Sequence, residues 1–326
     1  GIISAFVDNV ATVLMVAPVA LAICKKLNTN PVPFIIGIAV SSNLQGAATL
    51  VGDTTAIMLG SYADMSFLDF FWYKGRPGIF FAVELGAVAS ALILAWLFRK
   101  EKKPIDRATQ LTPVTDYVPT VLLAGMIVLL ISASFLPSKP DITNGLICVT
   151  LFVIGMVYTY VRTRKTEAFT GPIKSIDFET IGLLLGLFLV IGGITHMGVV
   201  DAAAGLLAKM GGGNVFLIYT VIVWASVLFS AFIDNIPYVA TMLPVVTGLA
   251  STLGIDPTLL YFGLLSGATL GGNMTPIGAS ANIAGIGILR REGYEVKTSD
   301  FCRIGIPFTL SAVIPAYIYL WLMYGV

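Results

Sequence analysis

Long apolar stretches separated by short polar segments run through the whole chain. Runs of about 20 apolar residues are long enough to cross a bilayer core as helices. Residues 34–62 and 258–289 instead predict helices that break near the middle, because their glycines and small polar residues disfavour a continuous helix. Uninterrupted spans are predicted near residues 78–98, 117–136, 142–160, 178–197 and 305–324.

One motif, Ser-Ala-Phe-hydrophobic-Asp-Asn, occurs at residues 4–9 and again at 230–235. The same offset aligns residues 4–57 with 230–283 without a gap and gives 16 identical pairs in 54 positions. Unrelated sequences of this composition would share far fewer. The chain therefore contains an internal duplication, which in a membrane protein indicates two structural halves that meet at a shared site.

The second copy of the motif lies in an apolar stretch, residues 214–250, that is too long for one crossing and has few polar residues for a loop between two. We predict a re-entrant hairpin there, with its tip at Asp234 and Asn235, and a matching tip at Asp8 and Asn9. Non-helical backbone at membrane depth is tolerated only where protein or a water-filled cavity surrounds it. Two tips and two broken helices would therefore meet at a wet site near the midplane.

The composition supports a polytopic membrane protein and argues against several other classes. The chain is 57% hydrophobic, 11% charged and has a net charge of +1, so it is more apolar than a soluble protein of this length. The three cysteines (Cys24, Cys148 and Cys302) form no Cys-x-x-Cys pair, and His196 is the single histidine. Neither a metal site nor imidazole chemistry is indicated, and no basic run or aromatic platform points to nucleic acid. We expect a protein of a bacterial or archaeal inner membrane, in contact with the lipid bilayer and without a cofactor apart from bound Na⁺.

The basic loops give the orientation of the halves. Loops 99–116 and 162–177 are rich in Lys and Arg, which places them in the cytoplasm. Five crossings between the two motifs then invert one half relative to the other. The predicted fold is an all-α polytopic membrane protein with two inverted-topology repeats, each with a re-entrant hairpin and a discontinuous transmembrane helix.

The predicted repeats differ in length. Residues 1–98 would be the C-terminal part of repeat one, 99–116 a cytoplasmic linker, and 117–326 repeat two. More of repeat two precedes its motif than of repeat one, so the chain is expected to be truncated at its N-terminus.

The candidate site consists of the two tips and the polar residues of the two breaks. Asp8, Asn9, Asp234 and Asn235 are the candidate cation- or proton-coupling residues, because an aspartate inside a bilayer is costly unless paired, solvated or protonated and carboxylate oxygens suit hard cations. Helices that restart after a break point their N-terminal amides at the site, which favours an anion or a polar neutral solute. The candidate substrate-binding residues are Ser4, Asn43, Gln45, Thr49, Gly52, Asp53, Thr54, Thr55, Ser230, Asn273, Thr275, Gly278, Ser280 and Asn282.

Structural roles compete with these assignments. Asp8 and Asp234 could instead cap the outgoing arms of their hairpins, since aspartate is a good N-cap residue. The glycines of the breaks, among them Gly52 and Gly278, could allow close helix packing rather than form a binding loop.

These motifs resemble the ion transporter superfamily, in particular the group that contains ArsB-type arsenite permeases, NhaD-type sodium/proton antiporters and the melanosomal P protein. The Asp-Asn motif followed by a proline is similar to the hairpin tip of that group, and Thr-x-hydrophobic-Gly at residues 49–52 and 275–278 is similar to its broken helix. Residues 52–56 read Gly-Asp-Thr-Thr-Ala, where the group usually has Gly-Asp-Pro-Pro-Asn. The resemblance implies a secondary transporter of a small inorganic ion coupled to H⁺ or Na⁺. It also implies a homodimer, and a soluble ATPase partner if the protein is an arsenite pump.

Several functions remain open at this point. These residues do not separate sodium/proton exchange from efflux of arsenite or another anion, although the Asp-Asn order resembles the antiporter and P-protein branches more closely. A dicarboxylate carrier is disfavoured, because relatives that handle carboxylates usually have Ser-Asn-Thr in place of Asp-Asn. A passive channel is an alternative, whereas an intramembrane aspartyl protease, and hence an enzyme, is disfavoured because its usual Tyr-Asp and Gly-x-Gly-Asp motifs are absent from the sequence.

Overall fold

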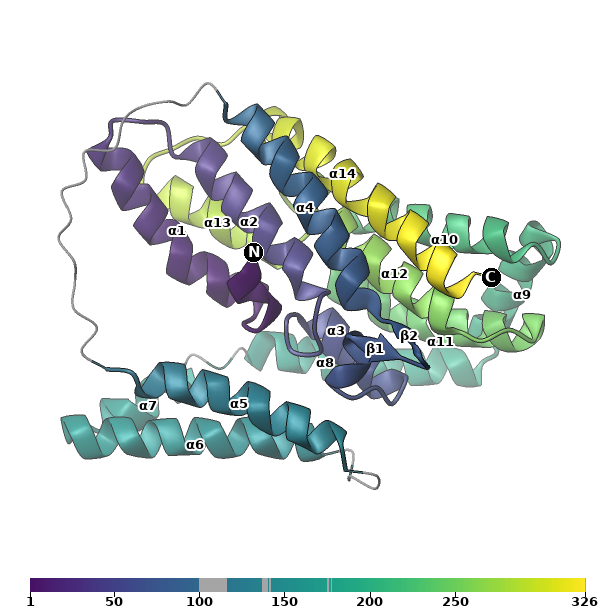
Figure 1. The fold of residues 1–326 in the computed structure, drawn as a ribbon, viewed down its shortest axis with the longest axis horizontal. Helices are drawn as coiled ribbons and strands as arrows, with labels where there is room; N and C mark the ends of the chain where they lie inside the picture. Colours follow the sequence, from purple (N-terminus) through teal and green to yellow (C-terminus); the bar gives the residue numbers. More distant parts are fainter. Residues whose placement is uncertain (100–115, 137–139, 141, 175, 177, 326) are drawn as a thin grey trace. The chain divides into compact units, whose positions relative to one another are not determined.

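The fold is built almost entirely from helices, as predicted for an all-α membrane protein (Figure 1). Five helices of the described part are long and apolar enough to cross a membrane, or six if one bent pair counts as a single span. The computed structural model describes residues 1–99, 116–136, 140, 142–174, 176 and 178–325. The five helices are α1 (Asn9–Lys26), α4 (Ile79–Leu97), α6 (Thr143–Thr163), α11 (Asn235–Leu253) and α14 (Thr298–Tyr324).

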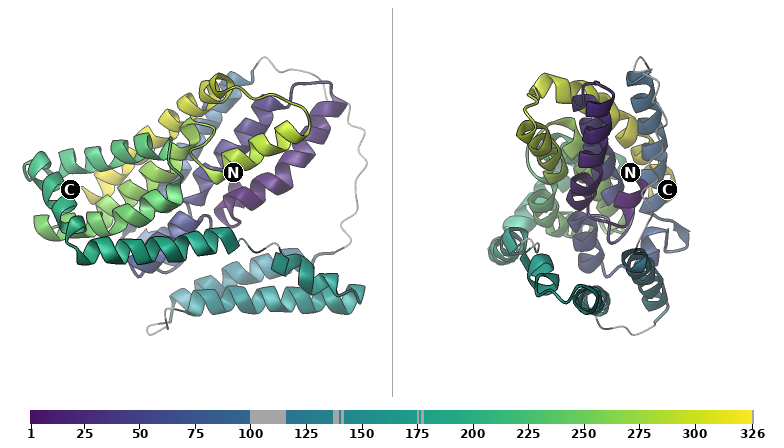
Figure 2. Two further views of the ribbon diagram at one scale, coloured as in Figure 1. Left: turned by 180° about the vertical axis from the view of Figure 1, so that it is seen from behind. Right: turned by 90° about the vertical axis from the view of Figure 1, so that its left-hand side faces the viewer.

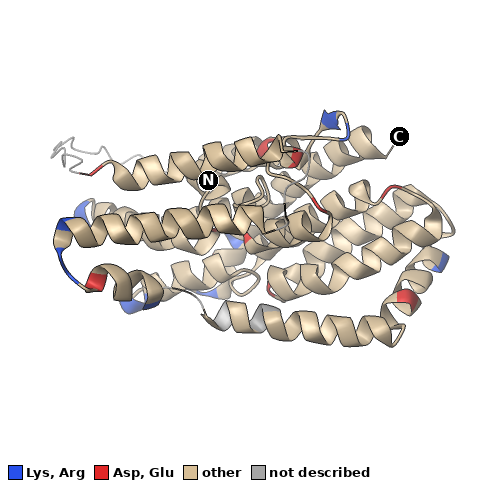
Figure 3. Cartoon of the chain, turned by 90° about the horizontal axis from the view of Figure 1, so that it is seen from below, with Lys and Arg blue, Asp and Glu red and all other residues tan. Residues whose placement is uncertain are grey.

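Charged residues lie mostly at helix ends and in the connections, while the lengths of the helices are largely uncharged (Figure 3). This is the distribution that a bilayer imposes, because a charge in the hydrocarbon core is costly. The bent pair consists of the stretch Leu185–His196 of α8 (Phe178–His196) and the helix α9 (Val199–Gly211), whose axes differ in direction by 71°. The sequence predicted a span near residues 178–197 and did not predict this bend.

Contacts divide the chain into two compact units, each described by itself. The division does not follow the predicted repeat boundaries, which stay a prediction, and most of the predicted linker 99–116 lies outside the described residues. The first unit consists of residues 1–65, 69–105 and 187–326, and the second of residues 66–68 and 106–186.

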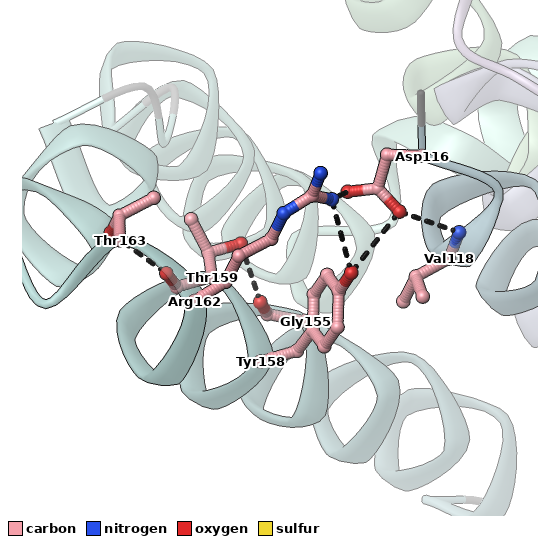
Figure 4. Close-up of polar contacts among 7 residues, drawn as sticks. All are labelled: Asp116, Val118, Gly155, Tyr158, Thr159, Arg162 and Thr163. Atoms are coloured by element: carbon pink, nitrogen blue, oxygen red, sulfur yellow. Dashed lines mark hydrogen bonds and ion pairs between the residues drawn. The ribbon is translucent and has the colours of Figure 1, made fainter. Parts of the chain in front are cut away.

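The second unit contains α5 (Val118–Ser134), α6, α7 (Glu167–Lys174) and the beginning of α8. Helix α7 lies within the segment predicted as the loop 162–177. At one end of α6, Arg162 forms an ion pair with Asp116 and donates a hydrogen bond to the hydroxyl of Tyr158 (Figure 4). The contact joins the end of α6 to the residues that precede α5.

Both interrupted helices of the first unit break as predicted. The first runs as α2 (Val32–Gly46) and restarts after the break as α3 (Thr54–Tyr62). The second runs as α12 (Thr258–Gly271), passes through the short 3₁₀ helix η3 (Gly272–Met274) and restarts as α13 (Ser280–Arg291). A helix also precedes each tip. The 3₁₀ helix η1 (Ile2–Ala5) comes before α1, and the helix α10 (Val215–Ser230) comes before α11.

The two halves interlock within this unit. Helix α1 of the first half packs against α13 of the second, and the equivalent helix α11 of the second half packs against α3 of the first. Figure 2 shows α13 beside α1 and α2. This reciprocal exchange of neighbours is what an approximate two-fold rotation between the halves produces. Helix α12, in which every residue is buried, forms the centre of the core.

A small hairpin lies outside the helical core of the first unit. Strands β1 (Trp72–Tyr73) and β2 (Arg76–Pro77) pair in antiparallel fashion, preceded by the 3₁₀ helix η2 (Leu68–Phe70). The sequence analysis predicted no strand in this segment. Within the same hairpin Lys74 reaches Asp256, in the connection between α11 and α12, with 2.5 Å between nitrogen and oxygen.

Candidate functional site

Each hairpin tip places its aspartate at the N-terminus of the outgoing helix. The Asp8 carboxylate accepts a hydrogen bond from the backbone N–H of Ala11 at 3.0 Å, and Asp234 accepts one from Ile236 at 3.0 Å. Asp8 is exposed and Asp234 half-buried. Both aspartates are therefore helix caps, the structural role that the sequence left open.

Matching contacts fasten each break to its own tip. The hydroxyl of Thr49 donates to the carbonyl of Ala5, and the hydroxyl of Thr275 donates to the carbonyl of Ala231. The two pairs are related by the offset of the repeat. The duplicated threonines therefore hold the duplicated tips in the same way.

The duplicated glycines allow the same close approach. A Cβ at Gly52 would lie 2.8 Å and 3.1 Å from the nearest two backbone carbonyl oxygens. At Gly278 the nearest two carbonyl oxygens would both be 2.6 Å away. One of these oxygens belongs to the broken helix itself (Gly46 or Gly272) and the other to the tip (Ala5 or Ser230). Both positions therefore require glycine, because the break folds tightly and the tip lies against it.

Amide side chains from both halves meet at the centre of the unit. Asn9, at the first tip, donates to the Asn43 side-chain oxygen at 2.9 Å. Asn43 in turn donates to the carbonyl of Thr269 at 2.8 Å and to the side-chain oxygen of Asn273 at 3.1 Å. Asn43 and Thr269 are equivalent positions of the two repeats, and equivalent residues that touch must lie close to the two-fold axis.

Asp53 is the buried carboxylate of this site, with a relative exposure of 3%. One of its oxygens accepts from the backbone N–H of Thr54 at 2.7 Å and caps α3. The other accepts from the Thr55 hydroxyl and from the side-chain amide of Asn235, both at 3.1 Å. The Thr55 hydroxyl also lies 3.2 Å from the hydroxyl of Thr269.

These contacts form one hydrogen-bonded network that joins the two tips through both breaks. Among the described residues, the buried polar side chains include no Lys, Arg or His that could neutralise Asp53. The carboxylates of Asp8 and Asp234 are near enough to act on its charge. In chain order the network consists of Asn9, Asn43, Asp53, Thr55, Asn235, Thr269 and Asn273.

The other predicted site residues lie around this network with simpler contacts. The Ser4 hydroxyl is 2.9 Å from that of Ser42, and Ser280 donates to the second carboxylate oxygen of Asp234 at 2.7 Å. The Asn282 amide donates to two carbonyls of the second break, at 2.9 Å and 3.0 Å. One buried side-chain atom in each of Gln45, Ser230, Asn273 and Asn282 has no hydrogen-bond partner within the protein. Such atoms suit a polar ligand, since burial without a partner is costly.

Three polar residues of this region were not among the predicted site residues. Thr269 is aligned with Asn43 by the repeat, which could have identified it. Ser42 holds the first tip by donating to the carbonyl of Asn9 at 2.8 Å. Thr309 of α14 is fully buried with an unpartnered hydroxyl and lies in no repeated motif.

The described residues contain no group of three or more His, Cys, Asp or Glu side chains able to hold a metal ion together. The oxygen donors at the network are one carboxylate, two threonine hydroxyls and several amides. Oxygen donors of this type suit a hard monovalent cation in transit better than a tightly held transition metal.

Comparison with known proteins agrees with this architecture. The family model described as citrate transporter (CitMHS) matches residues 1–262 and 146–326 of the chain. The chain belongs to this family. It is 34% identical over 330 residues to the uncharacterized transporter Rv2684 of Mycobacterium tuberculosis, covering 99% of this chain and 75% of that protein.

Two further relatives agree with this assignment. The 46 kDa membrane protein of Mycobacterium leprae is 33% identical, with 98% of this chain and 74% of that protein covered. The P protein of Homo sapiens is 28% identical, with 94% of this chain and 46% of that protein covered. The predicted resemblance to transporters that include the P protein is confirmed. The chain is an integral membrane transporter, and its bacterial relatives agree with the expected inner-membrane location.

Proposed function

We propose that the protein is a secondary active transporter that moves a small inorganic ion by alternating access, coupled to H⁺ or Na⁺. The observation that carries the proposal is Asp53, the one buried carboxylate among the residues that the structure describes, in a polar network contributed by both repeats. A site shared by two halves changes when the halves move against each other, as alternating access requires.

The chemistry of the network favours a small ion. Its ligands are amides, hydroxyls and one carboxylate, and no Lys or Arg side chain is among the buried polar residues of the described part. Sodium/proton exchange and efflux of arsenite or a similar anion are the two forms of the proposal.

Citrate is the second candidate, favoured by the family description. Helix α13 begins at Ser280 without a side-chain cap, and the N-terminus of a helix favours an anion. A citrate carrier would need this helix end and the buried amides to balance a multiply charged anion.

Flux in proteoliposomes with a trapped pH dye tests the proposal. A proton gradient is imposed, and Na⁺, Li⁺, arsenite or citrate is added in separate runs. We expect dissipation by one of the inorganic ions, with saturation and with loss in Asp234→Asn if that tip takes part in coupling. A non-saturating flux that needs no counter-ion would indicate a channel, and no response to any of the four would contradict the proposal.

A further inference from the structure

The repeated motif draws attention to Asp8 and Asp234, but the structure sets Asp53 apart from them. Asp8 is exposed and Asp234 half-buried, and each caps its own helix. Asp53 is 3% exposed and is the acid that bridges the halves, through the amide of Asn235. Burial of an ionised carboxylate without a cationic partner is costly. A change in the surroundings of Asp53 therefore changes the balance between its ionised and protonated forms.

The contacts of Asp53 accommodate both of its charge states without moving heavy atoms. Thr55 and Thr269 form a hydroxyl pair in which either oxygen can be the donor. When Asp53 is ionised, the Thr55 hydroxyl donates to it. When Asp53 is protonated, its O–H can donate to Thr55, and Thr55 then donates to Thr269. Amides cannot reverse in this way, since the N–H₂ group is only a donor.

We propose that Asp53 takes up and releases the coupling proton, with Thr55 and Thr269 as the hydroxyl pair that reorients with it. The step adds one H⁺ to a carboxylate oxygen and breaks no covalent bond. Protonation removes the charge that strengthens the contact from Asn235, and charge-assisted hydrogen bonds are roughly twice as strong as neutral ones. Protonation therefore weakens the contact between the second tip and the first break. This inference rests on the proposed transport function and names its coupling group.

Asp53 is the one residue of this network whose side chain is acidic or basic. The acids that act on its charge are Asp8 and Asp234. Helix α2 contains no titratable residue, and the titratable groups of α3, α11 and α12 are tyrosines. These are Tyr62, packed edge-on against the ring of Tyr261; Tyr238, hydrogen-bonded to Ser226; and Tyr261, hydrogen-bonded to Thr247.

Infrared difference spectroscopy of the purified protein tests the proton directly and needs no substrate. Between alkaline and acidic buffer, the wild type should gain a carboxylic C=O band that Asp53→Asn and Asp53→Ala lack and that Asp8→Asn and Asp234→Asn retain. The alanine variant is compatible with the backbone, because Ala279 occupies the equivalent position with φ −150° and ψ 144°, against −151° and 156° at Asp53. A wild type without the band, or a band that persists in both Asp53 variants, would overturn the proposal.

Flux separates this inference from the proposed function. With Na⁺, Li⁺ or arsenite as the probe, both Asp53 variants should fall to the leak of empty vesicles. Thr55→Ala should shift the pH profile of the rate, Thr55→Ser should restore it, and Gly287→Ala on open surface should match the wild type. An inactive wild type would refute the transport proposal itself. An active wild type whose pH profile survives in Asp53→Ala would refute the role of Asp53 alone.

Discussion

The two broken helices share one backbone design and differ in nearly every side chain that faces the network. At both breaks a threonine hydroxyl and a glycine hold the tip, through the same contacts. The side chains that carry charge or amides are not repeated. Asp53 and Thr55 of the first break are equivalent to alanines in the second, and Asn273 and Asn282 of the second are equivalent to alanines in the first.

This difference teaches that duplication preserved the scaffold while the chemistry was divided between the halves. The acid lies in the first break and the surplus amides in the second, so one composite site forms where the halves meet. Even the helix ends differ, since α3 starts with the acidic cap Asp53 and α13 starts without a side-chain cap. The network is therefore polarised across the two-fold axis, which an exact duplicate would not be.

The largest expected effect tests the shared scaffold. Gly278→Ala would place a methyl 2.6 Å from two backbone oxygens, and Gly52→Ala one at 2.8 Å. We expect overpacking to lower the free energy of unfolding by about 3 kcal/mol in the first variant and about 2 kcal/mol in the second. Denaturant titration in mixed micelles measures both.

Gly287→Ala is the matched control for this pair. It lies in α13 with no atom within 4 Å of the added methyl, and should stabilise the protein by up to about 1 kcal/mol. If the three glycine variants were equally stable, the tips would not lie against the breaks as described.

A second test compares the two tip asparagines. Asn235 donates to a carboxylate and Asn9 to a neutral amide. Hydrogen bonds to charged groups contribute more to stability than neutral ones. Asn235→Ala should therefore lower the free energy of unfolding by about 2 kcal/mol at neutral pH, and Asn9→Ala should lower it by about 1 kcal/mol. The gap should close in acidic buffer if Asp53 becomes protonated. Equal losses at neutral pH would mean that Asp53 is not charged there.

The sequence predicted the scaffold better than the network, for a physical reason. The identities at Thr49, Thr275, Gly52 and Gly278 mark positions where the backbone itself leaves little choice, and the breaks are found there. The partners across the axis, such as Asn43 and Thr269, are 226 residues apart and differ in type. No identity marks them, and only the offset of the repeat relates one to the other.

The repeated motif also drew attention to aspartates that are not the most buried ones. Asp8 and Asp234 stand out because they are repeated, whereas Asp53 is not repeated and is the most buried of the three. Hydropathy treats all three as acids in apolar surroundings. Their different exposure depends on which helix ends meet, and that is fixed by tertiary packing alone.

A third test asks whether the threonine anchors are equivalent. Thr49→Val and Thr275→Val each remove a hydroxyl that donates to a tip carbonyl while keeping the shape of the side chain. Each should lower the free energy of unfolding by about 1 kcal/mol, the usual contribution of a neutral hydrogen bond. A cost confined to one variant would show that the two tips are held differently.

The smallest effect concerns a pair of turns outside the spans. Asn30 accepts from the N–H of Val32 at 3.0 Å, and the equivalent Asp256 accepts from the N–H of Thr258 at 2.9 Å. Asp256 alone has a cationic partner, Lys74, and both side chains are about half exposed. Asp256→Asn gives the second turn the residue that the first turn has. It should lower the free energy of unfolding by less than about 1 kcal/mol, the usual contribution of an exposed ion pair.

The sign of the pH dependence sharpens this last comparison. Burial raises the pKa of Asp256, but the hydrogen bonds from Lys74 and Thr258 outweigh it and leave the pKa below its ordinary value. A lowered folded-state pKa contributes stability that is present above the unfolded value of about 3.9 and is lost as the pH falls through the folded value. The wild type should therefore exceed Asp256→Asn in thermal stability at neutral pH and lose that advantage in strong acid. An advantage that persists there would have to come from the shape of the turn, which the two residues share.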